Sequence, residues 1–186
     1  MTEPQLDQAI AILRRGGVIA YPTEAVWGLG CDPFDEAAVT RLLALKQRDV
    51  AKGLILVAAE VAQFDSLADW TALDPVQRDA VLASWPGPHT WIVPATARAP
   101  RWITGDHHGI ALRVSAHPLV VALCRGFDRA MVSTSANRAG APAPRTLDEF
   151  DSSLRNAVDA IVAGETSGLS RPTPIRDAHS GAALRE

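Results

Sequence analysis

The strongest constraint on the fold of this chain is the alternation of short apolar segments with helical ones. Helical segments are predicted to begin at Thr2, Asp35, Asp74 and His117, and Thr146–Glu149 has the pattern of a capping box for a last helix. Apolar segments of strand length fall at 18–21, 54–58, 90–93, 110–114, 130–133 and 160–163. Such alternation predicts an α/β fold, and strands that follow one another without an intervening helix predict a mixed sheet.

Size and composition narrow the class of protein further. The 186 residues suit a single domain, and no repeat or linker divides them. No apolar run approaches the ~18 residues of a membrane span, and the first residues lack the pattern of a signal peptide. Cys31 and Cys124 have no CxxC partner, so we expect free thiols in a reducing cytoplasm. The net charge of −3 argues against broad coating of nucleic acid but leaves a local basic cleft open.

Four polar segments lie at or just beyond the ends of predicted strands, where open α/β sheets bind ligands. The first runs from Tyr21 to Gly30 and offers the hydroxyl of Thr23 and the carboxylate of Glu24, both expected to be exposed. Gly28 and Gly30 would let the backbone approach a ligand, but a plain surface loop explains the segment equally well. The sequence contains no P-loop motif.

The second segment gathers three cations, Lys46, Arg48 and Lys52, ahead of a buried strand. These include the only two lysines among 18 basic residues. Three cations on one irregular loop suit a multiply charged anion such as a triphosphate, which arginine can bind in bidentate fashion. Capping of the preceding helix would account for Lys46 and Arg48, and a solvated loop would account for all three.

The third and fourth segments lie in and after later strands. Arg113 interrupts an apolar strand, so it must meet either an internal ion pair or an anionic ligand. Ser133, Ser135 and Asn137 offer hydroxyl and amide groups in a loop that ends in glycine, which suits a ligand but also a turn or a helix cap. No Cys or His spacing matches a zinc site, and no serine has a GxSxG elbow. The residues themselves therefore predict an anion-binding cleft without naming its ligand.

In their order along the chain, these segments resemble the YrdC/TsaC family, the threonylcarbamoyl-AMP synthases of tRNA modification. The similar stretches are Pro22–Pro33, Leu45–Arg48 with Lys52–Leu56, Trp85–Pro88, Ala111–Val114 and Ser133–Asn137, with a weaker match at Pro172–Asp177. The resemblance covers residues 6–186 as one domain and is greatest to the short bacterial form. Five motifs in the same order are far more specific than any one of them.

The resemblance implies a twisted mixed sheet with flanking helices around a positively lined cavity. It implies a cytoplasmic nucleotidyltransferase that converts L-threonine, bicarbonate and ATP into threonylcarbamoyl-adenylate and pyrophosphate. Mg²⁺ is expected as a cofactor with ATP, held mainly by phosphate oxygens, with no metal site made by protein ligands. The implied partners are TsaD, TsaB and TsaE, which move the threonylcarbamoyl group onto tRNA.

The resemblance also assigns roles to individual residues. Threonine-binding positions match Thr23, Arg113, Ser133, Ser135 and Thr173. ATP-binding positions match Lys46, Arg48, Lys52, Ser135, Asn137 and Arg185. The expected catalytic residues are Lys46, Arg48 and Arg113, because attack of a threonine carbamate on the α-phosphate needs orientation and charge neutralisation more than a covalent nucleophile.

Departures from the family pattern weaken some of these assignments. Asp49 replaces a common proline, Ala139 replaces a common serine, and Pro174 lacks an N–H in the tail motif. A different class of function is an RNA-binding module that uses a basic cleft without chemistry, with binding that falls steeply with salt and ignores threonine. Weak RNA binding by an enzyme of this family is a further expectation. A carbamoyl transferase is another alternative, although the chains that carry such modules are much larger.

Overall fold

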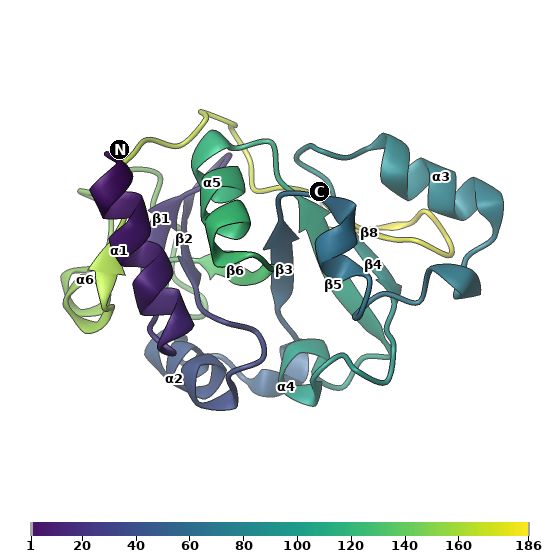
Figure 1. The fold of residues 1–186 in the computed structure, drawn as a ribbon, viewed down its shortest axis with the longest axis horizontal. Helices are drawn as coiled ribbons and strands as arrows, with labels where there is room; N and C mark the ends of the chain where they lie inside the picture. Colours follow the sequence, from purple (N-terminus) through teal and green to yellow (C-terminus); the bar gives the residue numbers. More distant parts are fainter. Residues whose placement is uncertain (1, 186) are drawn as a thin grey trace.

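The computed structural model describes residues 2–185, and within this range nine strands form one twisted mixed sheet (Figure 1). The strands are β1 Ile19–Pro22, β2 Trp27–Gly30, β3 Ile55–Ala58, β4 Thr90–Pro94, β5 Gly109–Val114, β6 Met131–Ser135, β7 Ala160–Ile161, β8 Ile175–Asp177 and β9 Ala183–Arg185. The α-helices are α1 Glu3–Arg14, α2 Glu36–Lys46, α3 Pro75–Ala83, α4 Arg101–Thr104, α5 Pro118–Phe127 and α6 Ser152–Ala157. The predicted α/β class with a mixed sheet is confirmed.

The helices begin where the sequence places their caps. The side chain of Asp35 accepts a hydrogen bond from the amide of Ala38 at 3.0 Å and caps α2. Asp74 and Gln77 form a capping box ahead of α3. No helix within residues 2–185 is both long enough and apolar enough to cross a membrane. Cys31 and Cys124 are buried and free, as predicted.

The order of the strands is β7-β1-β2-β6-β3-β5-β4-β8-β9, which places β3 near the middle of the sheet. Ile55 on β3 lies opposite Ser133 on antiparallel β6 and Ala111 on parallel β5. Two residues further along β3, Val57 lies opposite Arg113. Because side chains alternate between faces along a strand, these residues all project from one face of the sheet.

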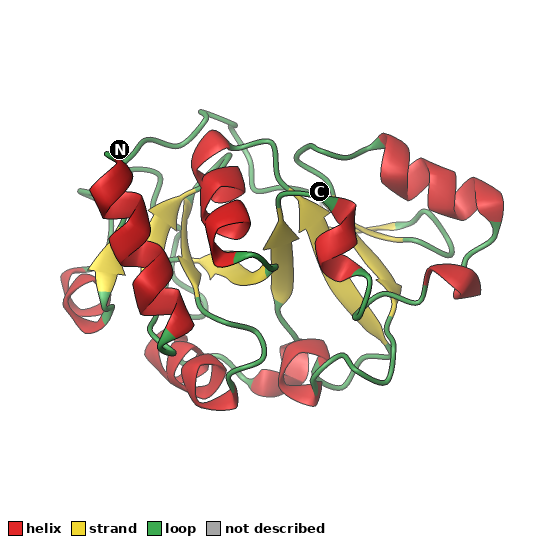
Figure 2. Ribbon diagram, viewed as in Figure 1, coloured by secondary structure: helices red, strands yellow, loops and turns green. Residues whose placement is uncertain are grey.

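That face is covered by helices over only part of its area. Helices α1 and α5 lie side by side over β1, β6 and β3, where they bury Tyr21, Val57 and Met131 (Figure 2). A second and larger cluster of apolar side chains, including Leu56 from β3, packs on the opposite face. The remainder of the first face carries the polar residues of the site described below.

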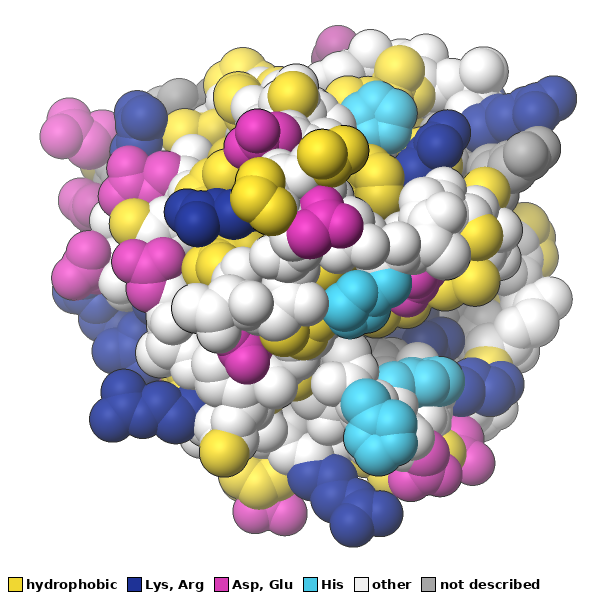
Figure 3. Space-filling view, turned by 90° about the vertical axis from the view of Figure 1, so that its right-hand side faces the viewer, with side chains coloured by type: hydrophobic (Ala, Val, Ile, Leu, Met, Phe, Trp, Pro, Cys, Tyr) yellow, Lys and Arg dark blue, Asp and Glu magenta, His cyan; other side chains and the backbone are white. Residues whose placement is uncertain are grey.

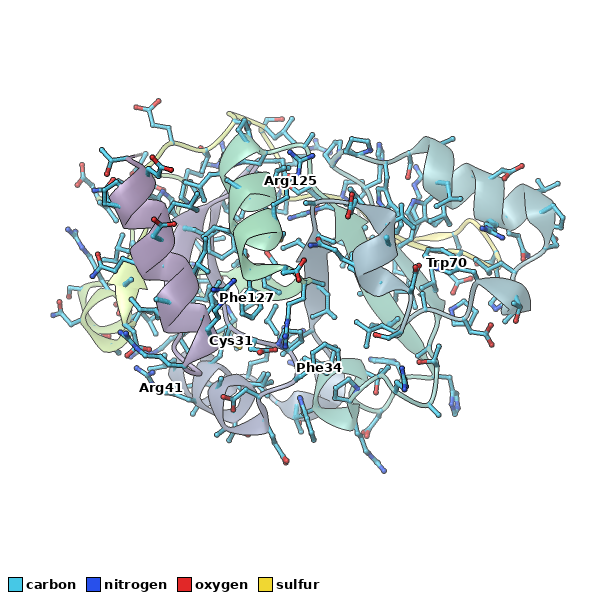
Figure 4. The ribbon with its side chains drawn as sticks, in the orientation of Figure 1. Cys31, Phe34, Arg41, Trp70, Arg125 and Phe127 are labelled. Carbon is cyan, nitrogen blue, oxygen red and sulfur yellow. The ribbon has the colours of Figure 1, made fainter. Side chains whose placement is uncertain are left out.

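The two ends of the sheet are closed by different elements. Helix α6 lies at the β7 end, and α3 lies at the opposite end beside β8 (Figure 1). Arg41 on α2 forms an ion pair with Asp159, which also accepts a hydrogen bond from the amide of Val18 at 2.7 Å and so fastens β7 to the sheet (Figure 4). At the other end, Trp70 packs edge-on against Trp85 with ring centroids 6.3 Å apart.

The sequence prediction missed strand β2, which it treated as part of a loop. The chain reverses after β1 through a turn in which the amide of Thr23 bonds to the carbonyl of Val26 at 3.1 Å. Strand β2 then pairs with both β1 and β6. A side chain at Gly30 would lie 2.7 Å from the carbonyl of Val132 and 2.9 Å from the Tyr21 ring, so this glycine serves strand packing.

The predicted capping box at Thr146–Glu149 is wrong. The carboxylate of Glu149 instead accepts a hydrogen bond from the amide of Arg145 at 2.7 Å. Helix α6 begins after Asp151, whose side chain accepts from the amides of Ser153 and Leu154. Phe150 is buried against Trp27 with ring centroids 6.5 Å apart, and its packing holds the chain in turns until Asp151. The short elements α4, β8 and β9 were also not predicted.

The packing of Gly30 yields a test of the fold. We expect Gly30→Ala to lower the free energy of unfolding by about 3 kcal/mol, because a β-carbon there forces β2 and β6 apart. Gly181→Ala is the control, since Gly181 has a φ of +70° but open space around it and should lose only about 1 kcal/mol. Urea unfolding measures both values. Equal losses in the two variants would contradict the close-packing explanation.

Candidate functional site

A cavity of about 260 Å³ opens on the part of the sheet that α1 and α5 leave uncovered. Its floor is formed by side chains from neighbouring strands, Ser133 from β6, Ile55 from β3 and Ala111 from β5. The strand register described above puts these residues in one row. Of the predicted site residues, those lining the cavity are Thr23, Arg48, Lys52, Arg113, Ser133, Ser135, Thr173 and Arg185. Residues spread from position 23 to position 185 thus meet at one place.

Arg113 is the most deeply buried of the cavity's cations, with 5% of its surface exposed. Its Nη2 atom lies 3.3 Å from Oε2 of Glu24, and its Nη1 donates to the hydroxyl of Thr173 at 2.6 Å. The other carboxylate oxygen of Glu24 accepts a hydrogen bond from the hydroxyl of Ser115 at 2.6 Å. The Nε of Arg113 is buried without a hydrogen-bond partner among the described residues. The predicted internal ion pair is confirmed, whereas binding of an anionic ligand by Arg113 stays a prediction, although the residue lines the cavity.

Glu24 corrects the sequence prediction, which treated it and Thr23 as exposed. Glu24 is 4% exposed and Thr23 is 6% exposed. The hydroxyl of Thr23 donates to the carbonyl of Val26 at 2.7 Å, within the turn between β1 and β2. A later segment of chain covers this turn, since the amides of Ser167 and Leu169 bond to the carbonyls of Thr23 and Glu24. The turn is buried because the carboxylate of Glu24 must reach the buried guanidinium of Arg113.

Three more cations line the cavity, and backbone carbonyls rather than carboxylates hold two of them. Nη2 of Arg48 donates to the carbonyl of Gly53 at 2.9 Å, and Nη2 of Arg185 donates to the carbonyl of Thr173 at 2.8 Å. Lys52 lies at the exposed side. Within residues 2–185, Arg48, Lys52 and Arg185 make no ion pair, and no Asp or Glu lines the cavity.

Burial and the proximity of these cations lower the pKa values of Arg48 and Arg185. Partial burial lowers the pKa of Arg185, and the nearby charges of Arg113 and Arg48 lower it further. Burial also lowers the pKa of Arg48. Like charges held together in a partly dry cavity are costly, and an anion relieves that cost. The cavity is therefore built to receive negative charge.

Lys46 and Asn137 do not line the cavity. The ammonium group of Lys46 donates to the carbonyl of Ser135 and, at 2.7 Å, to the carbonyl of Asn137. Burial lowers the pKa of Lys46 to about 8, with a smaller contribution from the charge of Arg48. The side-chain amide of Asn137 donates through Nδ2 to the carbonyls of Arg138 and Ala141. The predicted contacts of Lys46 and Asn137 with ATP stay predictions.

The sequence prediction missed several functional features of the site. It did not pair Glu24 with Arg113 or give Ser115 a role. Glu24 lies 91 positions from Ser115 and 89 (113 − 24) from Arg113, and residues so far apart carry no mutual signal in one sequence. It also missed His107, which lines the cavity after α4. In the described part of the chain no group of three His, Cys, Asp or Glu side chains is placed to bind a metal.

The fold and the site together define an α/β protein with a cation-lined cavity on the open face of a mixed sheet, and no carboxylate of residues 2–185 lines that cavity. Residues 11–186 match the family model Sua5/YciO/YrdC, whose description reads "Telomere recombination". The chain belongs to the Sua5/YciO/YrdC family.

Two curated relatives resemble the chain along almost its whole length. Over 184 residues it is 59% identical to a protein of Xanthomonas euvesicatoria pv. vesicatoria named "Threonylcarbamoyl-AMP synthase", with 97% of each chain covered. Over 185 residues it is 59% identical to a protein of the same name from Stenotrophomonas maltophilia, with 100% of each chain covered. Neither relative has an additional domain outside the region of similarity.

Solved structures show the same fold. The crystal structure of P. abyssi Sua5 complexed with L-threonine matches with a TM-score of 0.87 at 29% identity, covering 95% of this chain and 52% of that one. The crystal structure of E. coli YciO matches with a TM-score of 0.85 at 26% identity, covering 100% of this chain and 90% of that one. The chain thus spans about half the length of P. abyssi Sua5.

The buried pair of Glu24 and Arg113 can be tested by removing one charge. We expect Glu24→Gln to lower the free energy of unfolding by about 3 kcal/mol, because it leaves a buried guanidinium without its counter-charge. The control is Asp106→Asn, which breaks the exposed pair with Arg101 and should leave the unfolding midpoint unchanged. Chemical denaturation measures both variants. If Glu24→Gln is as stable as the control, the pair does not organise the site.

Proposed function

We propose that the chain is a threonylcarbamoyl-AMP synthase, a nucleotidyltransferase that consumes L-threonine, bicarbonate and ATP and releases pyrophosphate. The chain is an enzyme of the Sua5/YciO/YrdC family, and its curated relatives are named "Threonylcarbamoyl-AMP synthase". The observation that carries the proposal is the set of three cations, Arg48, Lys52 and Arg185, that face the cavity without carboxylate partners among the described residues. Such a set suits the phosphates of a nucleotide.

Threonine binds in this proposal at the buried end of the cavity. Arg113 offers its carboxylate a guanidinium already fixed by Glu24 and Thr173. An arginine with a fixed fork loses little entropy on binding and recognises a carboxylate in bidentate fashion. The hydroxyls of Thr23 and Ser133 line the same cavity and serve the remaining polar groups of the amino acid. The crystal structure of P. abyssi Sua5 with L-threonine supports this substrate.

ATP binds beside threonine, with its phosphates toward Arg48, Lys52 and Arg185. Apolar side chains of the wall, including Ile103 and Ile175, give the nucleoside a surface to pack on. Mg²⁺ arrives as part of the MgATP substrate, because no carboxylate among the described residues lines the cavity to hold it. The hydroxyl of Ser135 lines the same cavity and in this proposal contacts either substrate.

The reaction needs positioning and charge neutralisation more than a nucleophilic side chain. Bicarbonate and the threonine amine first form an N-carboxylate and water. A carbamate oxygen then attacks the α-phosphorus of ATP, the new P–O bond forms, and the bond to the β-phosphate oxygen breaks to release pyrophosphate. Cations preorganised around the cavity stabilise the charge that builds on the leaving pyrophosphate.

The product passes to the tRNA-modifying partners TsaD, TsaB and TsaE in this proposal. Weak RNA binding stays a prediction. On the face drawn in Figure 3, basic and acidic side chains are interspersed rather than sorted into a basic stripe. A non-catalytic RNA-binding module would show affinity that falls steeply with salt and is indifferent to threonine.

The activity itself is tested by following pyrophosphate. With Mg²⁺, ATP and bicarbonate present, we expect pyrophosphate release that depends on L-threonine and stops when bicarbonate is removed. Threonylcarbamoyl-adenylate should accumulate in equal amount, detected by mass spectrometry. Pyrophosphate release that ignores threonine, or no release together with salt-sensitive RNA binding, would reject the proposal.

Two substitutions test the division of the cavity between its substrates. We expect Arg48→Ala to raise KM for ATP about tenfold or more, because it removes a charge-assisted contact, while KM for threonine changes little. Arg113→Lys keeps the charge beside Glu24 but lacks the guanidinium fork, so it should raise KM mainly for threonine.

Steady-state kinetics of both variants are compared with those of Arg101→Ala, whose side chain is 87% exposed and outside the cavity. Arg101→Ala should behave as the unmodified enzyme. A pattern in which Arg48→Ala and Arg113→Lys each affect both substrates equally would contradict the proposed division.

A further inference from the structure

We infer that Lys46 is a positioning residue that does not touch substrate. It holds the serine-bearing wall of the cavity, residues 135–139, against the arginine-bearing loop, residues 47–53. The inference rests on the proposed function for the identity of the substrates. It differs from a role in phosphate binding, because Lys46 does not line the cavity and only 3% of the residue's surface is exposed.

The contacts of Lys46 run in both directions. Its Nζ donates to the carbonyls of Ser135 and Asn137, at the end of β6 and in the loop that follows. Its own carbonyl accepts a hydrogen bond from the amide of Ala139 at 2.8 Å. One residue at the end of α2 therefore fastens the loop at three points within five residues.

Lys46 also lies directly before the arginine-bearing loop, at the end of α2. Gln47, which follows Lys46, adopts the left-handed conformation with φ of 51° and ends α2. The amide of Arg48 returns to the carbonyl of Leu43 at 3.0 Å, and its side chain then turns into the cavity. Lys46 thus lies at the junction of the two walls that carry Ser135 and Arg48.

Lysine suits this junction for a physical reason. An ammonium group donates up to three hydrogen bonds and can satisfy several carbonyls at once, whereas those carbonyls would be costly if buried without donors. The carbonyls orient the ammonium without cancelling its charge, so Lys46 still adds to the positive potential of the cavity. The expected consequence is that loss of Lys46 weakens binding at both walls, and therefore of both substrates.

The test compares Lys46→Met with Lys52→Met, which removes an equal charge from the exposed side of the cavity. Calorimetry measures the affinity for L-threonine without nucleotide and for MgATP without threonine, and hydrogen exchange reports on the amides of residues 136–141. We expect Lys46→Met to weaken threonine and ATP binding each about tenfold and to speed exchange of the Ala139 amide. Lys52→Met should weaken ATP binding while threonine affinity and loop exchange stay unchanged.

Lys46→Arg, which keeps a cationic donor, should recover part of both affinities. Ala139→Pro removes the amide that donates to the carbonyl of Lys46 and leaves the Lys46 side chain in place, so it tests the junction if Lys46→Met does not fold. It should also weaken threonine binding and loosen the loop.

A Lys46→Met enzyme that loses ATP affinity but keeps threonine affinity and normal loop exchange would overturn the inference and assign Lys46 to the phosphates. If the unmodified protein itself binds no threonine, the proposed function fails. The exchange measurement then decides the inference alone, since faster exchange of the Ala139 amide in Lys46→Met supports the junction and unchanged exchange rejects it.

Discussion

The buried charge of Arg113 is the constraint on which the site depends. A guanidinium that is 5% exposed in a central strand is tolerable only if the chain brings partners to it. Those partners are Glu24 from the turn between β1 and β2 and Thr173 from the segment before β8. One side chain thus joins an early turn, the middle of the sheet and the tail of the chain. The burial of Glu24, and the covering of its turn by residues 167–169, follow from that demand.

The other arginines of the cavity differ from Arg113 in the groups that hold them. Arg113 already has a carboxylate partner, Glu24, which offsets its charge, and its buried Nε has no hydrogen-bond partner among the described residues. Arg48 and Arg185 are oriented by backbone carbonyls, which fix the direction of a guanidinium but leave its charge uncompensated. The cavity therefore has one neutralised arginine and a group of free positive charges. In the proposed function, this difference separates the part of the cavity that receives the amino acid from the part that receives the polyanion.

Local signals in the sequence predict most of the helices and most of the strands, because caps and apolar periodicity act within a few residues. Asp35 and Asp74 mark true helix starts, whereas the pattern at Thr146–Glu149 fails because burial of Phe150 against Trp27 competes with it. Strand β2 is hidden by its glycines, whose role emerges only once β6 and the Tyr21 ring lie against them. Eight predicted site residues line the cavity, and they come from within strands, from the segments beside strands and from the loop after α2. The pairing of Glu24 with Arg113 could not be predicted, because a buried ion pair between distant segments leaves no periodic signal.

The only two lysines of the chain show why a charge motif cannot be interpreted from spacing alone. Lys46 and Lys52 flank the same arginine, and both were expected at the phosphates. Lys46 is the last residue of a helix, where its side chain reaches back to carbonyls of a neighbouring loop and is buried by them. Lys52 ends a 3₁₀ turn, Val50–Lys52, at the mouth of the cavity and remains exposed. Lys46 therefore lies behind the cavity wall formed by the loop after β6, and Lys52, six residues later, lies in front of it. The two lysines carry equal charges, but the end of α2 between them gives them different positions and different roles.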